Sequence, residues 1–239
     1  MALRALIFAV DGTLANTERD GHRPAYNAAF KEVGLSWHWD EKFYGSLLKI
    51  CGGLERLRYY AEHHDPAVNA RPDRDELLAR IHEIAVRNYQ RRLAEGHIRL
   101  RSDIGQLICD ARTDGVRLAI ASSSCEQNIV GLLKTHLGPK ADDWFEVIAS
   151  GDDTPAKKPA PDLYKNALAK LGLPPRDCLA VEDSPSGLTA SLAAGIPTVV
   201  TLGDYHQDED FDGARLVLHE TDELTLEKLR LWHATASTS

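Results

Sequence analysis

Beyond Ile98, short apolar runs alternate with segments of helical periodicity, and this alternation restricts the possible folds more than any other feature of the chain. Parallel strands need long crossover connections, so such a rhythm is typical of a parallel sheet covered by helices. We therefore predict an α/β fold with a doubly wound parallel sheet. Strands are predicted at 6–10, 116–121, 144–149, 178–181 and 197–202, with an edge strand at 214–219, and helices at 104–114, 126–137, 161–171 and 186–194.

The segment between the first strand and Ile98 is helical and poor in strands. Its clearest part runs from Asp73 to Glu95, where apolar residues recur at i, i+3 and i+4 spacing, as on one face of a helix. A helical block in this place suggests an inserted lid and not a continuation of the sheet. We expect a core of residues 1–16 and 97–239 and a helical cap of residues 17–96, which the length of 239 residues allows.

Charge and hydropathy exclude several classes of protein. The formal net charge is −8, and the clearest basic pair is Arg91-Arg92, so we expect no nucleic-acid partner. No stretch approaches the ~20 apolar residues that a membrane helix needs, and the four cysteines are far apart. We expect a cytoplasmic monomer that does not bind membranes; a chloroplast protein without its transit peptide would show the same features.

Polar residues follow four of the apolar runs. Asp11 follows the first strand, Ser122 the second, Lys158 comes beyond the third, and Glu182-Asp183 follows the fourth. The carboxyl ends of parallel strands lie at one edge of a sheet, so these side chains are expected to converge. A hydroxyl, an ammonium and carboxylates that hold a divalent cation are the groups that phosphoryl transfer requires.

Each of these residues also has a structural interpretation when taken alone. Asp11-Gly12 is a favourable turn dipeptide, the serines after 121 are able to cap the next helix, and Lys158 is able to lie in a solvated loop. Glu182-Asp183 would suit the start of a helix because of the helix dipole. Their shared position at strand ends favours an active site.

The same four segments resemble, in order, the four motifs of the haloacid dehalogenase-like phosphatases. These segments are Leu6–Leu14, Leu118–Ser122, Lys158–Asp162 and Val181–Ser184. Two of the motif sequences are Lys-Pro-Ala-Pro-Asp and Glu-Asp-Ser-Pro-Ser-Gly, and a lid is expected after the first motif. In these features the chain is similar to the branch of the family that contains CbbY, phosphoglycolate phosphatase and β-phosphoglucomutase. The resemblance implies a Rossmann-like core, a helical cap and Mg²⁺ as cofactor.

The resemblance also implies a role for each motif residue. Asp11 would be the general acid and base, Ser122 would bind the phosphoryl group, and Lys158 would bridge nucleophile and phosphate. The family's nucleophile is an aspartate two residues before Asp11, and this chain has Ala9 there. The implied metal ligands are the backbone oxygen of Asp11 and the carboxylates of Glu182 and Asp183, with the ligand at Ala9 lost.

Within that branch the sequence of the cap is most similar to CbbY. The matching segments include Thr17-Glu18, His22-Arg23 and Gly52–Arg56. Two departures are one extra residue between Thr17 and His22, and Leu54 in place of a lysine. A CbbY-like protein would act on xylulose 1,5-bisphosphate, whose removal protects the carboxylase Rubisco. In that case Thr17, Glu18 and His22 would lie where the lid meets the core, and Arg56 would reach the substrate from the lid. The implied substrate-binding residues are Gly12, Thr17, Glu18, His22, Arg56, Ser122, Ser123 and Lys158.

Ala9 changes the expected function because a methyl group neither attacks phosphorus nor ligates a metal. We predict a chain that binds a phosphosugar and barely turns it over. Asp11, Lys158 and both acids are retained. This favours a variant in which the aspartate at position 9 was replaced in order to trap substrate. The alternative is a natural, non-catalytic phosphosugar-binding protein. A phosphomutase that works by the same chemistry is the alternative for the parent enzyme.

Overall fold

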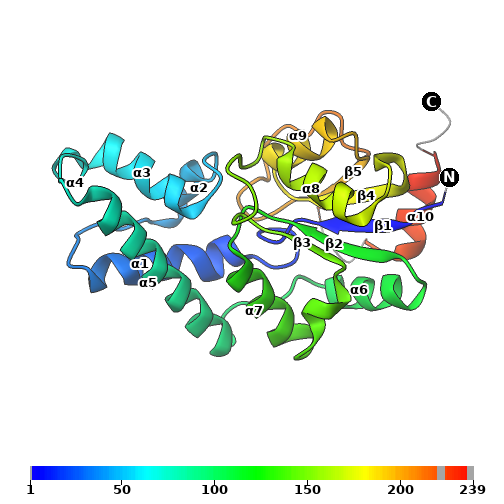
Figure 1. Cartoon of the computed structure of the whole chain (residues 1–239), viewed down its shortest axis with the longest axis horizontal. Coiled ribbons are helices and arrows are strands. Elements are labelled where there is room, and N and C mark those ends of the chain that lie inside the picture. Colours follow the sequence, from blue (N-terminus) through cyan, green and yellow to red (C-terminus); the bar gives the residue numbers. More distant parts are fainter. Residues whose placement is uncertain (1, 220–223, 236–239) are drawn as a thin grey trace. The chain divides into compact units, whose positions relative to one another are not determined.

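The computed structural model describes residues 2–219 and 224–235. By its internal contacts the chain divides into two compact units, a core unit of Met1–Asn16 with Arg99–Ser239 and a cap unit of Thr17–Ile98. Figure 1 shows the sheet within the core unit and the helices that make up the cap unit. The chain leaves the core after the first strand and re-enters it before the second.

The core unit contains a six-stranded sheet in the order β3-β2-β1-β4-β5-β6. Every neighbouring pair is parallel, so the predicted α/β fold class is confirmed. The predicted strand at 144–149 is wrong in its first part, because residues 141–144 form a short 3-10 helix and only the end of the segment pairs with β2. The strands are β1 Ala5–Phe8, β2 Arg117–Ala121, β3 Val147–Ala149, β4 Cys178–Glu182, β5 Thr198–Thr201 and β6 Leu216–Leu218.

Helices cover both faces of this sheet, with α6 and α7 on one side and α8 and α9 on the other (Figure 1). The strand residues under α8 and α9 include the small side chains Ala119, Ala149 and Ala180, which let the helices pack closely against the sheet. The helix α10 has no predicted counterpart. The helical segments of the core are α6 Ile104–Thr113, α7 Glu126–Leu137, η2 Ala141–Trp144, α8 Asp162–Leu171, η3 Pro175–Asp177, α9 Pro185–Ala193 and α10 Leu226–Thr235.

The strand order places a topological switch point at the centre of the sheet. From β1 the chain proceeds to β2 and β3 on one side, and from β4 it proceeds to β5 and β6 on the other. The connections on the two sides of the switch point depart on opposite faces, and sheets of this kind bind ligands at the carboxyl ends of the central strands. The sequence Asp11-Gly12-Thr13 follows β1 at this end of the sheet.

The cap unit is built around aromatic side chains. Tyr26 and Phe30 on α1 pack against Trp39, with ring centroids 5.2 and 4.8 Å from it. The Asn27 side chain donates to the backbone oxygen of Trp39 and accepts from its backbone nitrogen, each at 2.8 Å. The helical segments are η1 Glu18–His22, α1 Arg23–Glu32, α2 Glu41–Leu47, α3 Gly53–His64, α4 Pro66–Asn69 and α5 Arg74–Ala94.

The described residues contain no helix with the length and apolar character needed to cross a lipid bilayer. All four cysteines are free thiols, and Cys178 is the buried one.

Candidate active site

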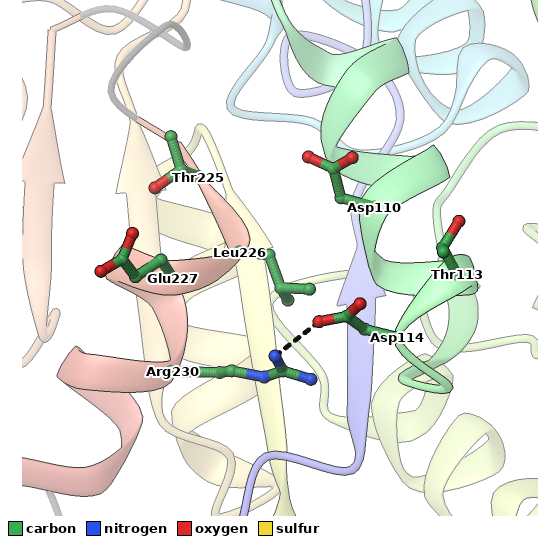
Figure 2. Close-up of a pocket in the computed structure, with 7 residues that line it drawn as sticks. All are labelled: Asp110, Thr113, Asp114, Thr225, Leu226, Glu227 and Arg230. Carbon is green, nitrogen blue, oxygen red and sulfur yellow. Dashed lines mark hydrogen bonds and ion pairs between the residues drawn. The ribbon is translucent and has the colours of Figure 1, made fainter.

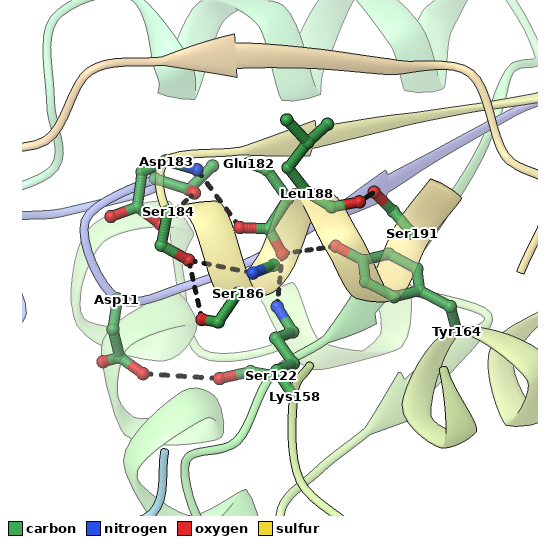
Figure 3. A network of polar contacts seen from close by, with 12 residues as sticks. Asp11, Ser122, Lys158, Tyr164, Glu182, Asp183, Ser184, Ser186, Leu188 and Ser191 are labelled. Atoms are coloured by element: carbon green, nitrogen blue, oxygen red, sulfur yellow. Dashed lines mark hydrogen bonds and ion pairs between the residues drawn. The ribbon is translucent and has the colours of Figure 1, made fainter. Parts of the chain in front are cut away.

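Two serine hydroxyls after β2 face the carboxylate that follows β1. The backbone nitrogen of Ser122 donates to Ala149 at 3.0 Å, which extends the pairing of β2 with β3 and fixes where the serine turn begins. From this turn, Ser124 Oγ donates to Asp11 Oδ2 at 2.6 Å. Ser122 Oγ donates to the same oxygen at 3.4 Å (Figure 3). The sequence predicted Asp11 and Ser122 as site residues but missed Ser124, although it belongs to the same run of serines.

A buried ion pair lies at the end of β4. Lys158 is 8 % exposed, and its Nζ donates to Glu182 Oε1 at 2.5 Å. The Tyr164 hydroxyl donates to the same oxygen at 2.5 Å, and the backbone nitrogen of Asp183 donates to Glu182 Oε2 at 3.1 Å (Figure 3). Both oxygens of Glu182 therefore have donors. Burial and the Glu182 carboxylate raise the pKa of Tyr164 well above its ordinary value, so its hydroxyl keeps its proton.

Asp183 is a second buried carboxylate beside Glu182. Its Oδ1 accepts a hydrogen bond of 3.2 Å from Thr13 Oγ1. Burial and the negative charge of Glu182 raise the pKa of Asp183 well above its ordinary value. Lys158 and Arg101 oppose that rise without cancelling it. The surroundings of Asp183 thus disfavour its negative charge.

Gly12 is required beside Asp183 for two reasons. Its φ is +79°, a conformation that other residues rarely adopt, and a Cβ there would lie 1.9 Å from Asp183 Oδ2. Arg101 holds the same turn, because it donates to the Gly12 backbone oxygen at 2.5 Å, to Thr201 Oγ1 at 3.0 Å and to the Leu202 backbone oxygen at 2.8 Å. Arg101 thereby ties the turn after β1 to the end of β5. No motif pointed to this arginine.

Ala9 lies at the end of β1 and is 3 % exposed. Its backbone nitrogen donates to Val181 at 2.9 Å, so position 9 is held against β4 by the sheet. Among the described residues, no three side chains of His, Cys, Asp or Glu gather as metal ligands. The Ser123 hydroxyl oxygen is buried, and nothing in the described part of the chain pairs with it. A buried hydroxyl of this kind is suited to a ligand oxygen.

The predicted cap residues Glu18 and Arg56 bind each other. Arg56 Nη2 donates to Glu18 Oε1 at 2.9 Å, Nη1 donates to the Tyr44 hydroxyl at 2.9 Å, and Nε donates to the Ile50 backbone oxygen at 2.8 Å. Burial alone would disfavour the charge of Arg56, but Glu18 and Tyr44 raise the pKa of Arg56 above its ordinary value. Arg56 is therefore a permanent cation with a carboxylate partner.

A π-helical turn lies between Thr17 and Arg23. Residues Glu18–His22 form this turn, closed by a hydrogen bond from the Arg23 backbone nitrogen to the Glu18 backbone oxygen. A π-turn holds one more residue than an α-turn and is frequent at functional sites. His22 stacks on Tyr89 with ring centroids 4.6 Å apart, and Thr17 is buried. All four predicted cap residues lie in the cap unit, and their binding role stays a prediction.

A hollow of about 420 Å³ lies elsewhere in the core unit, between α6 and α10 (Figure 2). Its arginine, Arg230, donates to Asp114 at 2.7 Å. With three carboxylates and an arginine that is already paired, this hollow is unsuited to a phosphate group. It is lined by Asp110, Thr113, Asp114, Thr225, Leu226, Glu227 and Arg230.

Replacing Gly187 with alanine is expected to destabilise the core unit by ~3 kcal/mol or more. A Cβ at Gly187 would lie 2.0 Å from Glu182 Oε2, and that carboxylate is buried and hydrogen-bonded, so it has no room to move. Gly105→Ala is the matched control, because its Cβ would lie 3.6 Å from the nearest atom. Alanine in that helix should stabilise by ~0.5–1 kcal/mol. Urea denaturation measures both changes, and equal effects would contradict the packing around Glu182.

Comparison with known proteins adds an independent finding. A family model described as haloacid dehalogenase-like hydrolase matches residues 6–201. The plasmid-encoded protein CbbY of Cupriavidus necator is 47 % identical over 219 residues, which are 90 % of this chain and 85 % of that protein. The crystal structure of CbbY from Rhodobacter sphaeroides with phosphate is 40 % identical and has a TM-score of 0.88, covering 96 % of this chain and 99 % of that one. A mutant of that protein in complex with xylulose 1,5-bisphosphate is 39 % identical, with the same coverage and TM-score.

Proposed function

Because this chain belongs to the CbbY family of haloacid dehalogenase-like hydrolases, we propose that its core site binds a phosphoryl group of a sugar phosphate. We propose xylulose 1,5-bisphosphate as the ligand, since a related CbbY mutant has been solved with that compound. The parent activity would be that of a phosphatase. Residues 1–16 and 97–239 would supply the chemistry, and residues 17–96 would form the cap.

The observation that carries this proposal is the grouping of complementary polar groups at the switch point of the sheet. Asp11 with its serine partners, the Lys158–Glu182 pair and Asp183 all lie at the carboxyl ends of the central strands β1, β2 and β4, or in loops beside them. In our proposal the Ser122 hydroxyl and the Lys158 ammonium bind oxygens of the phosphoryl group. The ammonium offsets charge on that group, and the hydroxyl donates a hydrogen bond to it.

Asp11 is proposed as the group that moves the proton. Its Oδ2 already accepts hydrogen bonds from Ser124 and Ser122, so the carboxyl is oriented before a ligand arrives. A carboxyl held in this way would protonate the leaving sugar oxygen and later take a proton from water. The Ser122 hydroxyl carries a single proton, so on ligand binding it would redirect its hydrogen bond from Asp11 to the phosphoryl oxygen, while Ser124 continues to hold Asp11.

Magnesium fits the acidic side of the site. Asp183 and Glu182 are adjacent buried carboxylates, and burial together with the negative charge of Glu182 raises the pKa of Asp183. Mg²⁺ prefers oxygen ligands, and when bound it would neutralise charge on the transferring phosphoryl group. We propose that Asp183 and the backbone oxygen of Asp11 hold it. Glu182 would supply a second negative charge while it remains paired with Lys158.

Ala9 is proposed to occupy the position of the missing nucleophile. An alanine methyl forms no covalent intermediate and supplies no metal ligand, so the site would retain its ligand without turning it over.

Calorimetric titration of the intact chain with xylulose 1,5-bisphosphate and Mg²⁺ tests this proposal. We expect saturable binding, and mass spectrometry of the bound compound should show both phosphates intact. Xylulose without phosphate groups is the matched control ligand and should not bind. If neither the bisphosphate nor any other sugar phosphate binds, the proposal is wrong.

A further inference from the structure

Tyr164 lies beside the proposed phosphate-binding lysine without belonging to any of the four motifs. Its hydroxyl and the Lys158 ammonium donate to the same oxygen, Glu182 Oε1, each at 2.5 Å (Figure 3). We propose that the Tyr164 hydroxyl is a positioning group, which shares the charge of Glu182 and so keeps Lys158 able to bind a phosphoryl oxygen. This inference rests on the phosphate-binding role proposed above for Lys158.

The shared oxygen is the physical basis of the inference. A buried carboxylate with a single strong donor draws that donor fully into the pair, because no water competes for it. Here Oε1 of Glu182 divides its accepting capacity between Tyr164 and Lys158, while Oε2 accepts from the Asp183 backbone nitrogen. The ammonium has three donors and uses one of them on Glu182, so it retains donors for a second anion.

The ring of Tyr164 is fixed by packing. It is fully buried in the apolar cluster between the sheet and helices α8 and α9, beside Leu163 and Ala167. Lys158 Nζ also lies 5.1 Å from the ring centroid. Phenylalanine would keep the ring, its packing and its face toward the lysine, and would remove only the hydroxyl. Tyr164→Phe therefore separates the hydrogen bond from the packing.

The first measurement is the affinity of the intact chain for inorganic phosphate in the presence of Mg²⁺. We expect Tyr164→Phe to weaken phosphate binding about tenfold, by analogy with the partners that orient metal ligands, whose loss lowers affinity by about 10- to 100-fold. Thr198→Val is the matched control, because the buried Thr198 hydroxyl donates to Ser191 Oγ at 2.7 Å within the same unit and has no contact with the ion pair. That variant should lower thermal stability without changing phosphate affinity.

The second measurement does not depend on a ligand. In ¹⁵N-lysine-labelled protein, the ammonium of a buried, hydrogen-bonded lysine exchanges slowly enough for detection by NMR, and Lys158→Arg identifies its signal. Tyr164→Phe should shift this signal, whereas Thr198→Val should leave it in place. If the parent chain binds no phosphate, the proposed function fails, and the Lys158 signal then reports only whether Tyr164 positions the ammonium. If the parent binds phosphate and Tyr164→Phe binds it equally well, the proposed function stands and the inference about Tyr164 is wrong. An unchanged Lys158 signal in Tyr164→Phe would overturn the inference, whatever the phosphate affinity of that variant.

Discussion

Ala9→Asp is expected to raise phosphate release from xylulose 1,5-bisphosphate by at least ~10⁴-fold and up to the order of 10⁶-fold, the usual cost of a missing nucleophile. The aspartate would supply a carboxylate oxygen that attacks phosphorus and another that ligates Mg²⁺. The groups that we assign to the remaining steps, Asp11 and Lys158, are already in the chain and already hydrogen-bonded. One substitution should therefore restore the whole reaction, as measured by phosphate release under saturating substrate.

Ala9→Asn is the matched control for that experiment. Asparagine has nearly the same shape as aspartate but lacks the nucleophilic carboxylate, so this variant should bind substrate and release almost no phosphate. Activity of Ala9→Asp no higher than that of Ala9→Asn would contradict the assignment of position 9 and favour a non-catalytic phosphosugar-binding protein. An isomerised sugar phosphate formed without phosphate release would indicate a phosphomutase instead.

Lys158→Met is expected to lower the free energy of unfolding by ~3–5 kcal/mol, because it removes the charged partner of a fully buried carboxylate. Glu182 would keep the Tyr164 hydroxyl and a backbone nitrogen as donors, and neither carries a positive charge. The same substitution should weaken phosphate binding by ~10- to 100-fold, since a hydrogen bond between charged groups contributes roughly 1.5–3 kcal/mol. Chemical denaturation and calorimetry measure the two effects separately.

Lys165→Met is the control for the loss of a positive charge. Lys165 is an exposed residue of helix α8, so its replacement should change stability by less than ~0.5 kcal/mol and leave phosphate affinity unchanged. Equal effects of the two substitutions would show that net charge, and not the Lys158–Glu182 pair, determines both properties. A stability change without an affinity change in Lys158→Met would contradict the binding role alone.

The two units differ in how a buried charge is balanced. In the core, Glu182 shares one oxygen between Lys158 and Tyr164, and burial and the charge of Glu182 raise the pKa of the neighbouring Asp183. In the cap, Arg56 meets Glu18 through two nitrogens and so holds a complete pair. The core carboxylates thus share Lys158 as a cation, hydrogen-bonded to Glu182, whereas Glu18 in the cap has Arg56 as its own partner.

Several site residues were not predictable from motif spacing. Tyr164 lies on the inward face of its helix, and a buried tyrosine hydroxyl usually has a hydrogen-bond partner, so a signal was present in the sequence. Ser124 had a similar signal, because it continues the serine run that begins at Ser122. Arg101 had none, since its partners are a hydroxyl and backbone oxygens from turns that are distant along the chain.

Helix α10 and the short strand β3 show where periodicity was insufficient. The buried residues Leu226, Leu229 and His233 have helical spacing, but the apolar stripe is short and ends near the end of the described chain. In the segment 144–149, three residues pair with β2, and Trp144 instead lies under the guanidinium of Arg112 at 4.8 Å. Local propensity does not report such side-chain contacts.

The sequence by itself determined the parallel α/β core, the helical block inserted after the first strand and the set of polar residues at the strand ends, because periodicity and strand-end chemistry are local properties. It also determined that position 9 is alanine. Only the tertiary structure decided which group partners which: that Glu182 binds Lys158 and Tyr164 through one oxygen, that Asp11 is held by Ser124, and that Arg56 is paired with Glu18. Such pairings depend on atoms brought within 3 Å of one another by strand order and loop path, and neither spacing nor composition encodes that distance.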